Sequence, residues 1–192
     1  MDTEFSPEQS LRLITSMIDK TRKSISDKSY YFLIWGWGTF LACIAQFILK
    51  VYFNSPYHYQ VWWVIVPCIL LSVLAGKRDK HGQQVKTYIG ETMGLLWMSL
   101  SITFFVMSMI FSKFGWQYCF PFFIMIYGLG TFISGRLLRF TPLVVGGIVC
   151  WVLAIISAWI DYDYQILATA MALLVSYIIP GHLLRWNFKK YI

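Results

Sequence analysis

The sequence predicts an all-α membrane protein with six transmembrane helices, arranged as three in–out–in hairpins and preceded by an N-terminal amphipathic helix. The prediction depends on the composition, on six apolar segments and on the positions of the basic residues. Hydrophobic residues make up 58% of the 192 positions and charged residues 13%, whereas about a quarter of a soluble domain is charged. Nine Trp and an aromatic content of 19% agree, because Trp and Tyr concentrate at membrane–water interfaces.

Six apolar segments follow one another along the chain. Crossing the ~30 Å hydrocarbon core takes about 20 helical residues, and the first, third and fifth segments have that length. The other three are shorter, so either their helices continue past the glycines that follow them or the bilayer thins locally. Outer-membrane β-strands are excluded, because they would alternate apolar and polar residues. The segments span about residues 30–49, 60–75, 89–111, 117–133, 142–160 and 165–179.

The basic residues orient these segments. All but two of the 16 Lys and Arg residues lie before the first segment, after the second, after the fourth or after the sixth, and the other loops hold only Lys50 and Lys113. Because cytoplasmic loops are enriched in Lys and Arg, we expect both termini in the cytoplasm. The net charge of +7 is therefore spread between membrane segments. Nucleic-acid binding, which needs bases clustered on one face, is not expected.

Two short motifs recur and suggest an internal repeat. Gly76, Gly135 and Gly181 each stand at the end of an even-numbered segment, ahead of a basic residue or His. The motif Tyr-x-Tyr-Gln occurs at 57–60 and at 162–165, each time with its Gln sixteen positions before one of these glycines. Fixed-period similarity indicates duplication, here of hairpins related by an axis along the membrane normal. The alternative is that interfaces select Tyr and helix ends select Gly independently.

The N-terminal segment, residues 1–29, predicts a cytoplasmic amphipathic helix and a linker. Ser6 suits an N-cap, Pro7 the first helical position and Gln9 a capping box, and apolar and basic residues then fall on opposite sides. Such a helix can lie in the membrane interface, pair with a protein partner or a second copy, or cap the bundle. Residues 30–186 form the expected transmembrane domain, and residues 187–192 form a cytoplasmic tail.

A family resemblance is carried by the start of the chain. It runs from Ser6-Pro7-Glu8-Gln9-Ser10-Leu11 through Ile25-Ser26-Asp27 to Tyr31-Phe32-Leu33-Ile34-Trp35-Gly36-Trp37. Over about residues 1–40 the chain resembles an uncharacterised family of small, six-span bacterial inner-membrane proteins. The resemblance implies a multi-pass protein of the bacterial inner membrane, and it brings no active-site residues to transfer.

Polar side chains near the cytoplasmic ends form a candidate inner-mouth cluster. It consists of Glu91, His81, Arg136, Arg139, His182 and Arg185. Such a cluster can bind an anion or a lipid headgroup, and Glu91 can serve as a proton or cation site. The alternative is that the bases are orientation signals with snorkelling side chains and that Glu91 only complements a helix dipole. Pro67 is a candidate helix break, as found in transporters, or an ordinary membrane-helix proline.

Two further features predict how the segments pack. Trp97 and Trp151 lie deeper in their segments than the other tryptophans, so we expect them to pack between helices. Hydroxyl side chains recur in the third segment, and we expect them to bond to their own helix backbone. They are Ser99, Ser101, Thr103 and Ser108.

The sequence does not contain the motifs of the common catalytic chemistries. It has no Walker A motif, no Gly-x-Ser-x-Gly and no His-Glu-x-x-His, and its four cysteines form no Cys-x-x-Cys pair. We therefore expect no catalytic residues, no metal site and no cofactor. The expected function is that of a non-enzymatic accessory, regulatory or assembly protein, with the lipid bilayer and a protein or second copy as partners. The alternative is a small-solute transporter or channel built from parallel hairpin repeats.

Overall fold

The described part of the chain is helical throughout, as the sequence predicts. The computed structural model describes the backbone of residues 29–82 and 88–189 and the side chains of 29–77 and 90–186. No strand occurs within these residues. The amphipathic helix expected before residue 29 and the tail beyond residue 189 lie outside them.

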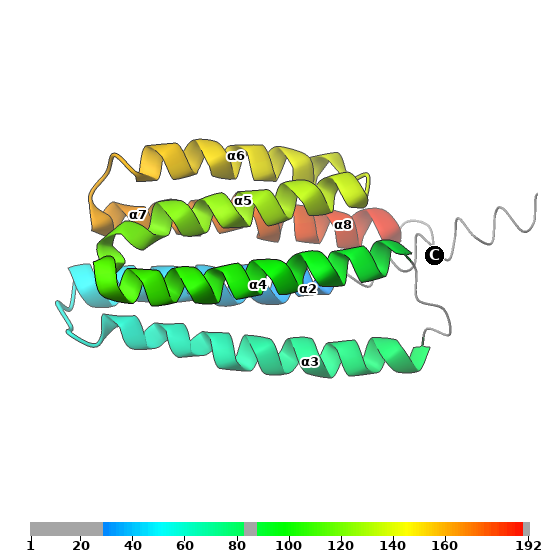
Figure 1. Cartoon of the computed structure of the whole chain (residues 1–192), viewed down its shortest axis with the longest axis horizontal. Helices are drawn as coiled ribbons and strands as arrows, with labels where there is room; N and C mark the ends of the chain where they lie inside the picture. Colours follow the sequence, from blue (N-terminus) through cyan, green and yellow to red (C-terminus); the bar gives the residue numbers. More distant parts are fainter. Residues whose placement is uncertain (1–28, 83–87, 190–192) are drawn as a thin grey trace, which may run out of the picture.

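Each apolar segment corresponds to one helical stretch, and the stretches lie side by side (Figure 1). Three of them change helix type along their length. The elements are α2 (Ser29–Val51), the 3-10 helix η1 (His58–Val64) leading into α3 (Ile65–Gly82), α4 (Tyr88–Phe114), the 3-10 turn η2 (Trp116–Tyr118) leading into α5 (Cys119–Leu137), α6 (Thr141–Ser157), and α7 (Tyr162–Leu173) continuing through the π-helix η3 (Leu174–Ile178) into α8 (Ile179–Lys189).

Within the described residues, five stretches are long and apolar enough to cross a membrane. The three segments that the sequence predicts to be short are longer in the structure, because their helices continue past the glycines. They form the spans His58–Lys77, Trp116–Leu137 and Tyr162–Trp186, of 20, 22 and 25 residues. The fifth segment is the shorter one instead. Its helix α6 ends at Ser157 and has 17 residues, because the backbone turns there, with the Ala158 N–H bonded to the carbonyls of both Ala154 and Ile155.

The helices form an inner group and two outer members. Helices α2, α5, α6 and the α7–η3–α8 stretch pack on one another, whereas α3 packs against α2 and η1, and α4 against α5 and η2. Figure 1 shows α3 at one edge of the bundle. The outer helices therefore leave most of their apolar surface uncovered by the rest of the chain.

The most extensive contact between two helices of the described chain is between α5 and α6, and glycines make it possible. A Cβ atom on Gly147 would lie 2.8 Å from the carbonyl oxygen of Gly128, and one on Gly135 would lie 2.6 Å from the backbone nitrogen of Val144. Small residues that let two backbones approach are the usual basis of helix packing in membranes.

The turn between α5 and α6 is short and closed by backbone hydrogen bonds. The Phe140 N–H donates to the Gly135 carbonyl at 2.9 Å, and the Arg139 N–H donates to the Arg136 carbonyl at 3.3 Å. Arg139 has φ +51°. These are the two bonds of a Schellman motif, whose left-handed position is usually occupied by Gly, so Arg139 holds a conformation that is unfavourable for its residue type.

The three glycines that precede basic residues do not end helices, because Gly76, Gly135 and Gly181 all lie inside α3, α5 and α8. Gly135 and Gly181 are packing positions, because a Cβ atom there would lie 2.6 Å from the Val144 nitrogen and 3.0 Å from the Leu33 side chain, respectively. A Cβ atom on Gly76 would make only an ordinary contact, 3.4 Å from the Tyr31 hydroxyl. Selection of Gly as a helix cap therefore does not explain the recurrence.

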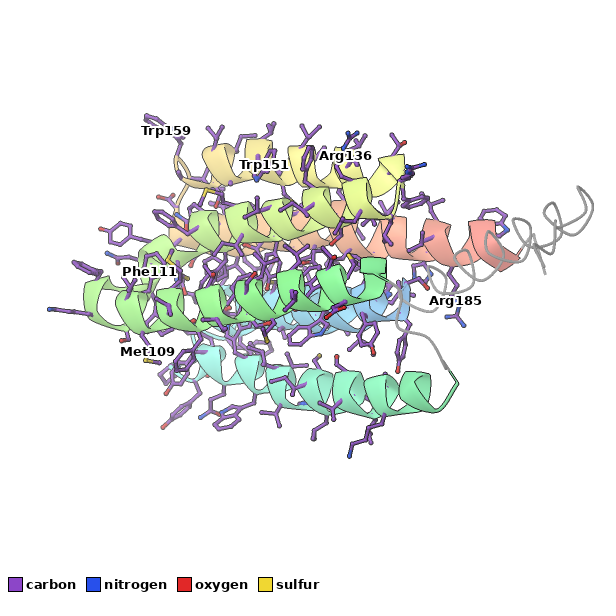
Figure 2. All side chains as sticks on the ribbon, turned by 45° about the vertical axis from the view of Figure 1, so that its right-hand side comes forward. Met109, Phe111, Arg136, Trp151, Trp159 and Arg185 are labelled. Atoms are coloured by element: carbon purple, nitrogen blue, oxygen red, sulfur yellow. The ribbon has the colours of Figure 1, made fainter. Side chains whose placement is uncertain are left out.

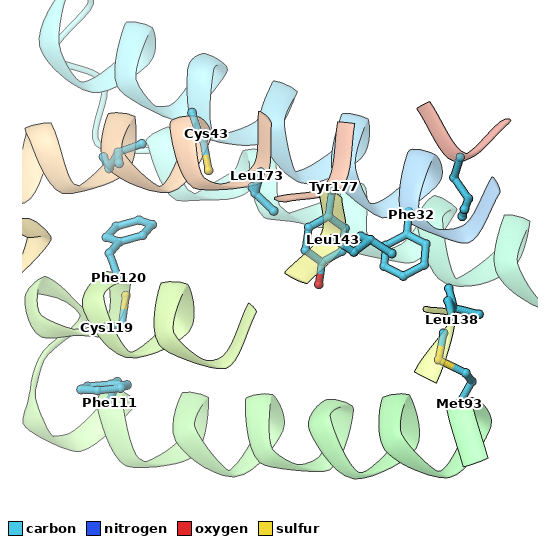
Figure 3. Close-up of a cluster of buried hydrophobic side chains, with 13 residues drawn as sticks. Phe32, Cys43, Met93, Phe111, Cys119, Phe120, Leu138, Leu143, Leu173 and Tyr177 are labelled. Carbon is cyan, nitrogen blue, oxygen red and sulfur yellow. The ribbon is translucent and has the colours of Figure 1, made fainter. Parts of the chain in front are cut away.

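Aromatic side chains fill the interior where α2, α4, α5 and η3 meet. The ring of Tyr177 lies 5.7 Å from that of Phe32, 6.0 Å from that of Trp97 and 5.6 Å from that of Tyr127, centroid to centroid. Figure 3 shows Phe32 and Tyr177 side by side in this core. Trp151 packs on Phe132 at 5.2 Å, so the prediction that Trp97 and Trp151 pack between helices is confirmed.

The glycine contact between α5 and α6 gives a matched test of stability. We expect Gly147→Ala to lower the free energy of unfolding by about 1–3 kcal/mol, because the added methyl group meets backbone atoms that cannot move aside. Gly94→Ala is the control, since no atom of the described part of the chain lies within 4 Å of a Cβ at that position; Ala there should be neutral or stabilising. Thermal unfolding of both variants in detergent measures the difference, and equal melting temperatures would contradict the packing role of Gly147.

Candidate functional site

A cluster of polar side chains lies at one end of the bundle, where α2 ends and α7 begins. Its centre is Gln46 of α2, whose side chain is only 2% exposed. The Trp62 Nε1–H donates to Gln46 Oε1 at 2.8 Å, and Gln46 Nε2 donates to the Tyr162 hydroxyl at 3.4 Å. Gln46 Nε2 also lies 3.4 Å from His58 Nδ1. One buried amide therefore connects α2 with η1 and α7.

An ion pair extends this cluster toward the surface. Lys50 is one helical turn beyond Gln46 on the same face of α2, and its ammonium pairs with the Asp163 carboxylate. The Lys50 Nζ also lies 4.0 Å from the centroid of the Tyr162 ring. We call the six residues the Gln46 cluster: Gln46, Lys50, His58, Trp62, Tyr162 and Asp163.

The ion pair and the buried amide of the Gln46 cluster contribute differently to the stability of the fold. The side chains of Lys50 and Asp163 are 29% and 41% exposed, and an exposed ion pair contributes about 0–1 kcal/mol. A buried polar group that loses its partner costs about 1–3 kcal/mol. The Gln46 amide is therefore the main stabilising group, and its arrangement suits a clamp that joins three elements.

The Gln46 cluster contains the middle residue of both Tyr-x-Tyr-Gln motifs, since His58 and Asp163 occupy that position. The two motifs differ in their last residue. Gln60 is exposed, whereas Gln165 is buried and donates to the Ile160 carbonyl at 3.0 Å. The motifs thus meet around the same part of α2 but are not structurally equivalent.

Sequence reasoning missed the Gln46 cluster. The available signals were a Gln inside an otherwise apolar segment, which is costly in a membrane, and a lone Lys50 opposite the acidic loop of residues 161–163. Neither signal indicates which side chains Gln46 or Lys50 contacts. Within the described residues, no group of three His, Cys, Asp or Glu side chains is placed to hold a metal ion.

The residues of the predicted inner-mouth cluster lie at the opposite end and are separate from one another. Arg136 and Arg139 are at the α5–α6 turn, and Arg185 is on α8; Figure 2 shows Arg136 and Arg185 toward the same end of the bundle on different helices. All are exposed, as are Glu91 on α4 and His182 on α8.

The residues of this predicted cluster are not joined to one another within the described side chains. In the part of the chain described, no hydrogen bond or ion pair links any two of them, and His182 instead accepts a hydrogen bond from Trp37 Nε1 at 3.4 Å. The side chain of His81 lies outside the described residues. A shared anion site at this end therefore stays a prediction.

Pro67 lies where the helix geometry changes. It is the third residue of α3, and the 3-10 helix η1 ends three residues earlier at Val64. Proline has no N–H to donate and its ring clashes with the carbonyl four residues before it, so an altered helix immediately upstream is the expected consequence. A role of this position in transport stays a prediction.

A second irregularity, which the sequence did not reveal, is the π-helix at Leu174–Ile178. It is held between glycines of two neighbouring helices. A Cβ atom on Gly36 of α2 would lie 2.9 Å from Tyr177 Cβ, and one on Gly146 of α6 would lie 2.9 Å from Ser176 Cα. Single π-turns are frequent at functional sites, so this segment is the second candidate region.

The hydroxyl side chains of α4 behave as predicted. Ser101 donates to the Trp97 carbonyl at 2.8 Å, and Thr103 donates to the Ser99 carbonyl at 2.9 Å. Ser99 and Ser108 bond in the same way to carbonyls three or four residues earlier. The prediction that these groups are satisfied by their own helix is confirmed, and they build no polar path across α4.

The clamp role of Gln46 can be tested with a matched pair of variants. We expect Gln46→Leu to lower the free energy of unfolding by about 1–3 kcal/mol, because the Trp62 indole and the Tyr162 hydroxyl lose their partner. Gln60→Leu makes the same change at an exposed position and should be nearly neutral. Thermal unfolding in detergent compares them, and a Gln46→Leu protein as stable as the Gln60→Leu protein would show that the amide holds nothing together.

Comparison with family models, with curated proteins and with solved structures finds no match for this chain. The resemblance of the first forty or so residues to a bacterial membrane-protein family therefore stays a prediction.

Proposed function

We propose that the chain crosses the bacterial inner membrane six times, as three in–out–in hairpins with both termini in the cytoplasm. Five candidate spans are present in the described residues, and α6 is apolar with 17 residues. At 1.5 Å per residue such a helix reaches about 26 Å, close to the ~30 Å hydrocarbon core.

The packing of α6 supports its membrane position. Gly147 meets the backbone of α5 and Gly146 meets that of η3. A helix that is in backbone contact with two candidate spans shares their depth, so α6 is more simply a sixth span than a surface helix. Its shortness is compatible with local thinning of the bilayer.

We further propose that the protein is a non-enzymatic accessory, regulatory or assembly protein that acts through contacts with other membrane components. The observation that carries this proposal is the uneven burial of the helices. In the most apolar stretch of the His58–Lys77 span, and likewise in that of α4, 11% of the residues are buried. The corresponding fraction is 50% in the span that contains α5 and 61% in the span that contains α7 and α8. Two complete apolar helices thus face outward, where lipid or a partner helix covers them.

Helix α4 is the more suitable of the two for a protein partner. None of the described residues lies within 4 Å of a Cβ at Gly94, and Ser101 is exposed on the same helix. Small exposed residues permit another helix to approach closely. The N-terminal segment, residues 1–29, would supply a second contact in the cytoplasmic interface.

A small-solute transporter or channel is the alternative. The π-helix η3 and the change of helix type before Pro67 favour it, because transporter sites use irregular helices. The aromatic group around Tyr177 fills the interior between α2, α4 and α5, so a solute path there would require these rings to move. The accessory role needs no such rearrangement, and we prefer it for that reason.

The span count has a direct test. Six spans place both ends of the chain on one side of the membrane, and five place them on opposite sides. We expect a reporter fused after Ile192 and one fused before Met1 both to behave as cytoplasmic. A periplasmic signal from the C-terminal fusion alone would contradict six spans and indicate that α6 does not cross the membrane.

The accessory role can be tested by photo-cross-linking in native membranes. With benzoylphenylalanine in place of Phe105, which is 64% exposed on α4, we expect one protein adduct of fixed mass. The matched position is Val152 on α6, 53% exposed, where we expect lipid adducts alone. The same protein adduct from both positions would indicate random collision, and solute uptake by liposomes containing only this chain, without an adduct from Phe105, would favour the transporter.

A further inference from the structure

An apolar groove of about 330 Å³ lies on the outside of the bundle between α6 and the η3–α8 stretch. Its α6 wall is the first turn and a half of that helix, from Thr141 to Gly146. The other wall is formed by Val175, Ile179 and Pro180. The lining is almost wholly apolar, so a hydrocarbon is the chemistry that fits it.

The two walls of the groove meet at the π-helix. Because Gly146 has no side chain, the α6 and η3 backbones lie close together there; a Cβ on Gly146 would lie 3.0 Å from the Val175 carbonyl oxygen. The backbones thus close the floor of the groove while its outer side stays open.

A basic residue precedes the first lining residue of the groove along the chain. Arg139 is exposed and lies two residues before Thr141, in the turn that leads into α6. Its left-handed backbone is fixed by the hydrogen bonds of the turn. Guanidinium groups bind phosphate oxygens in a bidentate manner, and this one lies where the apolar surface of α6 begins.

We propose that the groove binds an acyl chain of an anionic phospholipid and that Arg139 holds the phosphate of the same molecule. The combination of an apolar groove open toward hydrocarbon and a base at its membrane-surface end is complementary to such a lipid, and basic pockets between transmembrane helices bind anionic headgroups in this way. The proposal depends on α6 lying in the bilayer and is independent of any protein partner.

Retention of phospholipid by the full-length protein tests this proposal. The protein is exchanged into micelles with phosphatidylglycerol or with phosphatidylcholine, and bound lipid is counted by native mass spectrometry. Val145→Trp fills the groove, and Val152→Trp makes the same change on the same helix outside it; the two valines are 52% and 53% exposed. Arg139→Gln removes the proposed phosphate contact, and Arg136→Gln removes the other exposed charge of the turn.

We expect the unmodified protein to retain phosphatidylglycerol in preference to phosphatidylcholine. Arg139→Gln should lower that retention about fivefold, the effect of one basic contact at an anionic lipid surface, and Val145→Trp should lower it at least as far. Val152→Trp and Arg136→Gln should retain as much as the unmodified protein.

Four results would overturn the proposal. Three concern the lipid: equal retention of the two lipids, full retention by Val145→Trp, or equal losses in Arg136→Gln and Arg139→Gln. The fourth is loss of a co-purifying protein instead of a lipid from Val145→Trp, which would assign the groove to a partner helix. Because lipid retention is measured on the purified chain, its failure is distinct from a failure of the span count or of the cross-linking.

Discussion

The contact between α5 and α6 determines much of the rest of the structure. Gly128, Gly135 and Gly147 let the two backbones approach to a distance that no side chain would allow. The short turn that joins them forces Arg139 into a left-handed conformation, which costs roughly 1–2 kcal/mol. That cost is tolerated because a wider turn would separate the glycines. Gly146 is next to Gly147 in α6 and faces the π-helix, so α6 is in close contact with α5 through one glycine and with η3 through the other.

The π-helix is where the glycine contacts and the aromatic core meet. It lies between Gly36 of α2 and Gly146 of α6, and its Tyr177 belongs to the aromatic group with Phe32 and Trp97. These rings fill the space between α2, α4 and α5, whereas α3 lies at the edge, in contact with α2 and η1.

The sequence predicted the helices well and the polar contacts poorly. A membrane-spanning apolar segment of about 20 residues must form all its backbone hydrogen bonds within itself. The segments 30–49 and 89–111 are therefore predicted correctly as helices. The even-numbered segments are predicted to end too early, because the basic residues in the sequence indicate ends of the helices. The helices continue past them, since long basic side chains can reach the bilayer surface from within a helix. The Gln46 cluster joins residues up to 116 positions apart, and no local pattern encodes such a pairing. Whether Arg136 and Arg185 share a ligand stays a prediction, because packing decides which helix ends meet and the two residues lie on different helices.

The two ends of the bundle use their polar residues in opposite ways. Around Gln46 each polar group has a partner from another element of the chain, so that end restrains α2, η1 and α7 against one another. At the other end Arg136, Arg139 and Arg185 form no ion pair within the described residues. The first end thus stabilises the fold through contacts between elements, whereas the three arginines of the other end contribute no such contact within the described residues.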